Sequence, residues 1–220
     1  MSVTTRIWLQ KLNGGPASRE RQSHSARRLL QLACRSSGVE LNAGHLALPG
    51  PELISLIDEE FGLSISITHC RQLVAVALGK GRLGVDCEPL GRKRNWQGIA
   101  DHFFTPEEAS LIANAGEQER IFLRHWVLKE SYIKSVNGSV FGDLNRLALT
   151  DLGETARVES NNGDDSVWAW VGCFAGCVLG MYSSDTARPK LVFYETTDAA
   201  GTSSAPRRKQ VPGYFIPINQ

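Results

Sequence analysis

Two apolar runs on either side of a short glycine-containing turn constrain the fold of this chain more than any other feature. Residues 73–78 (LVAVAL) and 83–88 (LGVDCE) are short and largely aliphatic, as strands are. The intervening residues 79–82 (GKGR) favour a turn. This pattern predicts a β-hairpin over residues 73–88, within a fold that also contains helices.

Helical and strand patterns follow one another on both sides of this hairpin. A basic amphipathic helix is predicted over residues 18–35. Residues 105–108 (TPEE) have the order of a capping box with proline at the first helical position, and they predict a helix to about residue 113. A longer helix is predicted over residues 117–136, just before an Asn-Gly pair. Further strands are predicted at residues 64–68, 146–150, 156–159, 167–173 and 177–182.

A weak internal similarity indicates how the chain divides. Residues 69–79 (HCRQLVAVALG) resemble residues 172–182 (GCFAGCVLGMY) in pattern, which fits two similar α+β halves. The expected units are an N-terminal half over 1–82, a C-terminal half over 83–184 and a tail over 185–220. The tail is rich in Thr, Ser, Ala and Pro, so we expect a surface segment or a partly disordered arm with short apolar patches at 191–194 and 214–218.

The composition argues against several classes of protein. The formal net charge is +1, so no global field favours nucleic acid or a membrane surface. The N-terminus lacks the apolar core of a signal peptide, and the longest mostly apolar run, residues 167–182, is too short to span a bilayer. Five cysteines without a C-x-x-C motif indicate free thiols in a reducing compartment. We therefore expect a cytoplasmic protein that binds neither nucleic acid nor a membrane.

Two carboxylates share one face of the second apolar run. Asp86 and Glu88 are two residues apart, and the period of a strand sends both side chains to the same side. Their mutual repulsion would be relieved if one were protonated or if a hard divalent cation such as Mg²⁺ lay between them. An exposed strand face with ordinary solvated acids is the alternative, and this pair alone favours it.

The long helix predicted over 117–136 carries a second unusual pair. Glu130 and Lys134 fall within the same arc as an apolar stripe that includes Phe122, Val127 and Ile133. The rest of that stripe is Leu123 and Trp126, and the residues expected on the opposite face are Arg124, Ser131 and Ser135. The pair fits equally a half-buried salt bridge at the margin of the stripe and a catalytic pair beside a metal site.

Basic residues offer weaker candidates for a binding site. His69 follows a strand, where a lone histidine is more often structural or solvated. Its place just before the residues that carry Asp86 makes a phosphate-binding role an alternative. Arg27 and Arg28 lie on the first predicted helix, where a solvated face is the default expectation.

Four short motifs together resemble the 4′-phosphopantetheinyl transferases. Residues 84–88 (GVDCE) match a (V/I)G(V/I)D-x-E strand, and residues 126–134 (WVLKESYIK) match a (F/W)-x-x-K-E-(A/S)-x-x-K helix about forty residues later. Residues 103–108 (FFTPEE) resemble the FF(S/T)-x-x-E segment of the family, and residues 66–70 (SITHC) its N-(L/I)-S-H-(S/C) element. The resemblance covers about residues 20–180 and is to the longer, monomeric Sfp-type form of the holo-acyl-carrier-protein synthase superfamily.

This resemblance implies a fold and a set of site residues. The fold would be α+β, a pseudo-dimer of two similar halves, each with a small antiparallel sheet packed on a long helix, with coenzyme A in the cleft between them. By this resemblance, Asp86, Glu88 and Glu130 would be Mg²⁺ ligands, and Lys134 would face the pyrophosphate. Thr68 and His69 would contact the 3′-phosphate of coenzyme A. Arg27 or Arg28 would contact one of the coenzyme A phosphates. Two features depart from the family pattern. Residues 46–53 (LALPGPEL) lack the lysine of its (H)GKP segment, and Thr68 replaces a serine.

The implied reaction moves 4′-phosphopantetheine from coenzyme A to a serine of an acyl, peptidyl or polyketide carrier protein. Glu130 or a metal-bound water would take the serine proton. The basic residues at 92–94, in a loop expected over 89–101, and the region 103–125 are candidate contacts for an acidic carrier, and the length suggests secondary metabolism. A non-catalytic coenzyme A-binding module and a Mg²⁺-dependent phosphoesterase are the alternatives.

Overall fold

The computed structural model describes residues 4–13, 17–136, 144, 147–150, 157–160, 167–184, 190–197, 207–211 and 213–218. The helices are α1 (Arg19–Ser36), α2 (Ala43–Ala47), α3 (Gly50–Phe61), α4 (Trp96–Phe103), α5 (Pro106–Ala113) and α6 (Gln118–Ser135). The strands are β1 (Thr4–Lys11), β2 (Ser64–His69), β3 (Leu73–Gly79), β4 (Leu83–Pro89), β5 (Leu147–Thr150), β6 (Arg157–Ser160), β7 (Val167–Phe174), β8 (Cys177–Ser183), β9 (Lys190–Thr197), β10 (Arg207–Lys209) and β11 (Gly213–Ile218).

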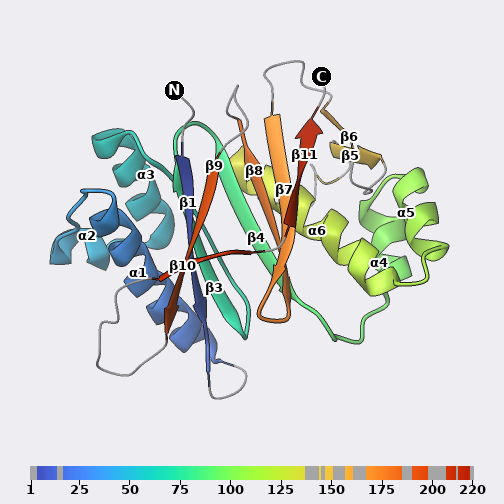
Figure 1. Cartoon of the computed structure of the whole chain (residues 1–220), viewed down its shortest axis with the longest axis horizontal. Helices are drawn as coiled ribbons and strands as arrows, with labels where there is room; N and C mark the ends of the chain where they lie inside the picture. Colours follow the sequence, from blue (N-terminus) through green and yellow to red (C-terminus); the bar gives the residue numbers. More distant parts are fainter. Residues whose placement is uncertain are drawn as a thin grey trace.

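Two sheets pack against each other, and helices cover the outer face of each (Figure 1). The first sheet has the strand order β10-β9-β1-β3-β2 and the second the order β11-β7-β8-β4, while β5 and β6 form a separate pair. Helices α1 and α3 pack on the first sheet in a core that includes Leu30 and Val76. Helices α4–α6 pack on the second sheet around Val127 and Val171, and Val85 belongs to the core between the sheets. The predicted α+β class is confirmed.

The predicted β-hairpin over residues 73–88 is wrong, because its two strands belong to different sheets. Strand β3 pairs with β1 and β2, whereas β4 pairs with β8. Both strands are buried almost throughout, so neither shows the polar alternation that would mark a solvent face. The glycine-containing link carries the chain from one sheet to the other, with Gly81 at a φ of +69°, and β4 packs against β2 and β3.

The described parts of the C-terminal segment, residues 190–197, 207–211 and 213–218, add strands to both sheets, which corrects for these residues the expectation of a surface arm over 185–220. Strand β9 runs parallel to β1, β10 pairs with β9, and β11 pairs with β7. The apolar patches at 191–194 and 214–218 are parts of these strands, and Phe193 packs on Trp170 with ring centroids 5.0 Å apart. The small polar residues of the segment hid these strands, because their partners lie far away in the sequence. The division of the chain at residue 82 stays a prediction.

The capping box predicted for α5 is present, whereas α4 was not predicted. In α5, the Thr105 hydroxyl accepts from the Glu108 amide at 3.3 Å, and the Glu108 carboxylate accepts from the Thr105 amide at 2.9 Å, which confirms the capping box. The loop expected over 89–101 contains most of α4, which begins after Asn95. No helix within the described ranges is both long and apolar enough to cross a membrane.

Helix α6 lies directly on the second sheet because two glycines leave it room. A Cβ added at Gly84 would come within 1.7 Å of the Ser131 carbonyl oxygen, and one at Gly180 within 2.6 Å of the Val127 carbonyl oxygen. The face with Ser131 and Ser135, expected opposite the apolar stripe, is therefore buried against the strands. Helix α6 is buried on nearly all sides, so the prediction of one apolar face and one polar face does not describe it.

Substitution of Gly84 by alanine is expected to lower the free energy of unfolding by about 2–3 kcal/mol, because the added methyl group must push α6 away from β4. Gly116→Ala is the matched control, since an added Cβ there meets nothing within 4 Å. Urea unfolding followed by circular dichroism measures both. A Gly84→Ala protein as stable as the control would contradict the close contact.

Candidate active site

A cavity of about 540 Å³ opens where the N-terminus of α1 meets the ends of β2 and β4. Arg19, Arg71 and Arg92 line it together with His69, and Glu88 lies at its wall. The remaining lining residues are Ala17, Ser18, Gln22, Cys70, Cys87 and Pro89. Three guanidinium groups and the N-terminus of an 18-residue helix favour anions. The cavity is therefore a candidate site for phosphate groups.

Asp86 on β4 is held between the two sheets and α6. Its Oδ1 accepts from Lys134 Nζ at 2.7 Å and from the Thr68 hydroxyl at 3.0 Å. Lys134 Nζ also donates to the Val85 carbonyl at 3.2 Å. Burial lowers the pKa of Lys134, but the adjacent Asp86 carboxylate more than offsets this, so that the pKa lies above its ordinary value. Lys134 is therefore a fixed ammonium group, and the carboxylate that it meets is Asp86.

Glu88, two residues along β4, faces the loop that follows this strand. Its Oε2 lies 3.7 Å from Arg92 Nη1 and 3.4 Å from Arg94 Nη2. The loop is fixed by Glu119, which accepts hydrogen bonds from the amides of Gly91 and Arg92. Burial raises the pKa of Glu88, and the two arginines oppose this shift. Among the described residues, Arg92 and Arg94 contact Glu88, whereas Lys93 between them is exposed and does not.

Glu130 lies one turn before Lys134 on α6 and is half-buried. Its side chain makes no hydrogen bond or ion pair with another residue in the described part of the chain. Burial and repulsion from Asp86 and Glu88 raise its pKa to about 7, against the opposing influence of Lys134. The three carboxylates are thus close enough to act on one another.

These three acids fit Mg²⁺ by their chemistry, since the ion prefers carboxylate oxygens and would relieve the repulsion that raises the pKa of Glu130. They are not drawn together as ligands: no group of three or more His, Cys, Asp or Glu side chains is arranged to hold a metal among the described residues. Asp86 and Glu88 instead meet cationic side chains. The Mg²⁺ ligand set stays a prediction.

The predicted nucleotide contacts divide into two groups. His69 lines the cavity, and its Nδ1 donates to Gln22 Oε1 at 2.9 Å, which leaves Nε2 as the nitrogen available to a ligand. Thr68 is buried, and its hydroxyl contacts Asp86. Arg27 donates to the carbonyls of Leu46 and Leu48 and so holds the segment at 46–53.

Neither Arg27 nor Arg28 lines the cavity, where the arginines are Arg19, Arg71 and Arg92. Sequence reasoning missed Arg19 and Arg71, and it named Arg92 only as a candidate contact for the carrier protein. Arg19 directly follows Ser18, which caps α1, and Arg71 lies two residues after His69. The position of Arg19 beside the N-cap of a helix was the feature of the sequence that could have indicated an anion site.

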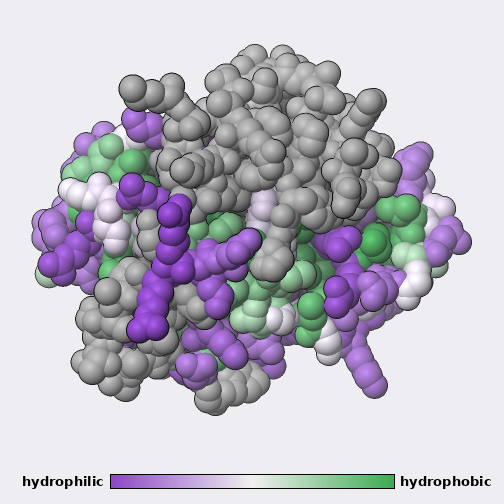
Figure 2. All heavy atoms as spheres, viewed as in Figure 1, coloured by the Kyte–Doolittle hydropathy of each residue, from purple (hydrophilic) through white to green (hydrophobic). Residues whose placement is uncertain are grey.

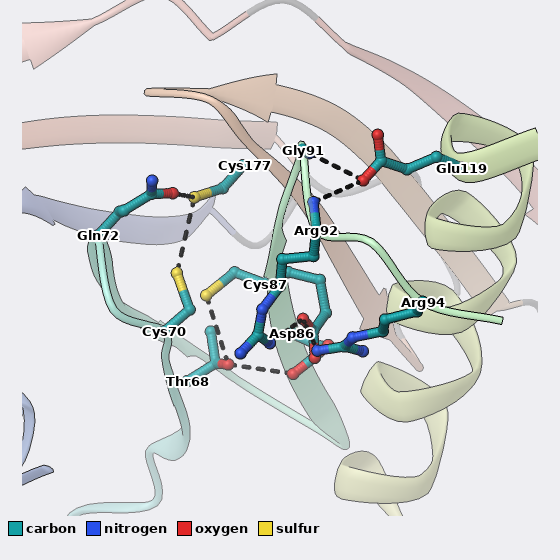
Figure 3. A network of polar contacts seen from close by, with 11 residues as sticks. Thr68, Cys70, Gln72, Asp86, Cys87, Gly91, Arg92, Arg94, Glu119 and Cys177 are labelled. Atoms are coloured by element: carbon teal, nitrogen blue, oxygen red, sulfur yellow. Dashed lines mark hydrogen bonds and ion pairs between the residues drawn. The ribbon is translucent and has the colours of Figure 1, made fainter. Parts of the chain in front are cut away.

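Cys70 and Cys87 line the cavity, and Cys177 lies behind them. Cys70 and Cys177 have their sulfur atoms 3.6 Å apart, and Cys87 Sγ lies 3.7 Å from the Thr68 hydroxyl (Figure 3). Hydrogen bonds from the neighbouring thiols lower the pKa of Cys70, and the same interaction raises the pKa of Cys177. All five cysteines are free thiols, as predicted, although Cys173 is exposed.

A buried ion pair fixes α6 beneath the candidate site. Lys129 Nζ lies 2.7 Å from Glu108 Oε2 and donates to the Leu144 carbonyl at 2.8 Å. Glu108 Oε1 accepts from the Leu149 amide at 2.7 Å, and the Lys129 ammonium lies 4.9 Å from the Phe104 ring centroid. Burial lowers the pKa of Lys129, and Glu108 opposes this shift. The pair ties α5, α6 and β5 together next to Glu130.

Known proteins share parts of this sequence. Residues 82–176 match the family model of the 4′-phosphopantetheinyl transferase superfamily. The chain is 30% identical over 84 residues to 4′-phosphopantetheinyl transferase HetI of Nostoc sp., covering 37% of this chain and 35% of that protein. It is 24% identical over 142 residues to a putative 4′-phosphopantetheinyl transferase of Synechocystis sp., covering 63% of this chain and 56% of that protein. The chain therefore matches about a third of the length of the first of these curated relatives and just over half of the second.

The matched segment contains Asp86, Glu88, Glu130 and Lys134, together with the capping box of α5 and the buried Lys129. The resemblance stated from the four motifs is thus confirmed. Over its segment 82–176, which is less than half of the chain, the sequence is similar to the 4′-phosphopantetheinyl transferase superfamily.

Proposed function

We propose that this chain transfers the 4′-phosphopantetheine group of coenzyme A to a serine of an apo acyl, peptidyl or polyketide carrier protein and releases adenosine 3′,5′-bisphosphate. The observation that carries the proposal is the Asp86–Lys134 pair, with Glu88 and Glu130 nearby, beside a cavity lined by arginines. Transfer from a pyrophosphate needs both parts: carboxylates for a divalent cation and fixed cations for the phosphates.

The nucleotide end of coenzyme A would lie in the cavity at the N-terminus of α1. Arg71 and His69 would contact the 3′-phosphate and Arg19 would add charge beside them, since all three line this cavity. They supply the positive charge that a lysine in residues 46–53 would otherwise give. We also assign the two sheets with their helices to the halves of a pseudo-dimer, with coenzyme A in the cleft between them.

Asp86, Glu88 and Glu130 would hold Mg²⁺. When bound, the ion supplies positive charge that neutralises the pyrophosphate. Lys134, oriented by Asp86, presents its ammonium group to the same pyrophosphate and stabilises the departing bisphosphate. Glu130, with a pKa of about 7, accepts the proton of the serine hydroxyl as its oxygen attacks the phosphorus.

The carrier protein would approach over the exposed Lys93 and the outer face of α5, where Leu111 is 43% exposed. An acidic carrier surface complements the lysine, and the leucine offers an apolar contact. By resemblance to Sfp-type members, the chain would act as a monomer in secondary-metabolite assembly.

The transfer assay tests this function with and without a carrier. The protein is incubated with Mg²⁺ and coenzyme A, and apo carriers from fatty-acid, polyketide and peptide assembly are then weighed by mass spectrometry. We expect one carrier class to gain the mass of phosphopantetheine. Breakdown of coenzyme A without a carrier would indicate a phosphoesterase, and binding without any turnover would indicate a coenzyme A-binding module.

Arg71→Ala is expected to weaken coenzyme A binding by about 10–100-fold, because a charge-assisted contact to a phosphate is lost. The loss should be much smaller for 3′-dephospho-coenzyme A, which lacks the phosphate concerned. Arg28→Ala is the matched control, since Arg28 is exposed on α1 and does not line the cavity. Isothermal titration calorimetry measures the affinity of each of the two variants for each of the two ligands. Equal losses for both ligands would contradict the assigned contact.

A further inference from the structure

Two neighbouring thiols, one from each sheet, lie beside the cavity. Cys70 lies in the turn between β2 and β3 of the first sheet, and Cys177 begins β8 of the second sheet. Their sulfur atoms are 3.6 Å apart (Figure 3). We infer that Cys70 and Cys177 are a site of reversible disulfide formation that covalently joins the two sheets. This inference is independent of the proposed transfer activity.

The two thiols differ in their access to solvent. Cys70 is partly exposed and lines the cavity, whereas Cys177 is fully buried in the core between the sheets. A small oxidant that enters the cavity therefore meets Cys70 first. Cys177, already beside it, is the resolving thiol. One accessible cysteine next to a second thiol is the usual arrangement of a reversibly oxidised site.

The backbone around the pair allows the sulfur atoms to approach. A disulfide needs an S–S distance of about 2.05 Å, so the pair must close by about 1.5 Å from its present separation. Cys177 is fixed between Pro89 of β4 and Phe174 of β7. Cys70 lies in a turn whose next two residues, Arg71 and Gln72, are exposed. The closing movement therefore falls on the Cys70 side of the pair.

Glutathione disulfide is a sufficient oxidant. Cys70 Sγ attacks one glutathione sulfur, a protein–glutathione disulfide forms, and the first glutathione leaves as a thiolate. Cys177 Sγ then attacks Cys70 Sγ, and the second glutathione leaves. The protons of the two protein thiols pass to the two glutathione thiolates. Two electrons move from the protein to the oxidant, and one disulfide is exchanged for another.

The other thiols predict a selective reaction. Cys34 is buried and is not among the thiols that act on Cys70. Cys87 is the competing partner, because its thiol also interacts with Cys70, but its sulfur contacts the Thr68 hydroxyl at 3.7 Å. Cys173 is exposed, and its sulfur makes no hydrogen bond with another thiol of the described residues. We therefore expect Cys173 to stop at a mixed disulfide with glutathione, whereas Cys70 goes on to the intramolecular bond.

The test treats the full chain with glutathione disulfide and maps its peptides by mass spectrometry without reduction. We expect a peptide pair linked through Cys70 and Cys177, which dithiothreitol separates. Cys70→Ser should abolish the linked pair, and the matched variant Cys173→Ser should retain it. A linked pair through Cys87 or Cys173, or glutathione retained on Cys70, would overturn the inference.

Thermal unfolding provides a second measurement. A bond between residues 70 and 177 closes a long loop in the unfolded chain, so the oxidised protein should have a Tm several degrees above the reduced protein. Cys173→Ser should show the same rise, and Cys70→Ser should show none. A lower Tm after oxidation would mean that the native geometry does not accommodate the bond.

Discussion

Replacement of Glu130 by glutamine is expected to lower the rate of phosphopantetheine transfer by about 10²–10⁴-fold. The substitution keeps the shape of the side chain but removes both its negative charge and its ability to accept the serine proton. Glu130 is half-buried, has a pKa raised to about 7, and lies within the electrostatic influence of Asp86 and Glu88. The effect should fall on kcat more than on the affinity for coenzyme A, because the phosphate contacts lie in the cavity.

Glu60→Gln makes the same change of charge on the exposed end of α3 and should leave the transfer rate within about twofold of the original. The loss in Glu130→Gln should also remain at every Mg²⁺ concentration tested, because proton acceptance is lost as well as a ligand. Near-normal turnover in Glu130→Gln would show that the catalytic assignment is wrong.

Lys129→Met is expected to lower the free energy of unfolding by about 3–5 kcal/mol. The Lys129 side chain is 0% exposed and its partner Glu108 only 2%, so the substitution leaves an uncompensated carboxylate in the core. The Leu144 carbonyl also loses its donor. Methionine preserves most of the apolar volume, so the loss reports the broken polar network more than a cavity.

Lys80→Met is the control, since Lys80 is exposed in the link between the sheets. Urea unfolding compares the free energies of unfolding of the original protein, Lys129→Met and Lys80→Met. The double variant Glu108→Gln with Lys129→Met removes the buried charge and should be more stable than Lys129→Met alone. A loss below about 1 kcal/mol in Lys129→Met would contradict the view that this pair fixes α6.

The sequence predicted best what local chemistry determines. The capping box at 105–108 defines the start of α5, and the helix predicted over 117–136 agrees with α6 within one residue at each end. The acids on β4 and the acid–lysine pair on α6 were found because charged residues interrupt apolar patterns. Their meeting in space depends on the close approach of α6 to the sheet, which Gly84 and Gly180 allow.

The sequence could not determine what depends on distant partners. Strands β3 and β4 are both largely aliphatic and buried almost throughout, so pairing in one sheet and stacking between two sheets look alike in the sequence. The i,i+4 spacing of Glu130 and Lys134 suggested a local ion pair, but Lys134 bonds to Asp86 across two elements. The arginines of the cavity come from three separate segments, so no local pattern joins them.

The coupling between the two products tests the central claim most directly. With Mg²⁺, coenzyme A and the responsive apo carrier, adenosine 3′,5′-bisphosphate and phosphopantetheinyl carrier are quantified in the same reaction. The proposed mechanism predicts equal amounts of the two products, and none of either when the carrier serine is replaced by alanine. Bisphosphate that forms without modified carrier, or no modification of any carrier, would contradict the proposal that the carboxylates and Lys134 form a phosphopantetheine transfer site.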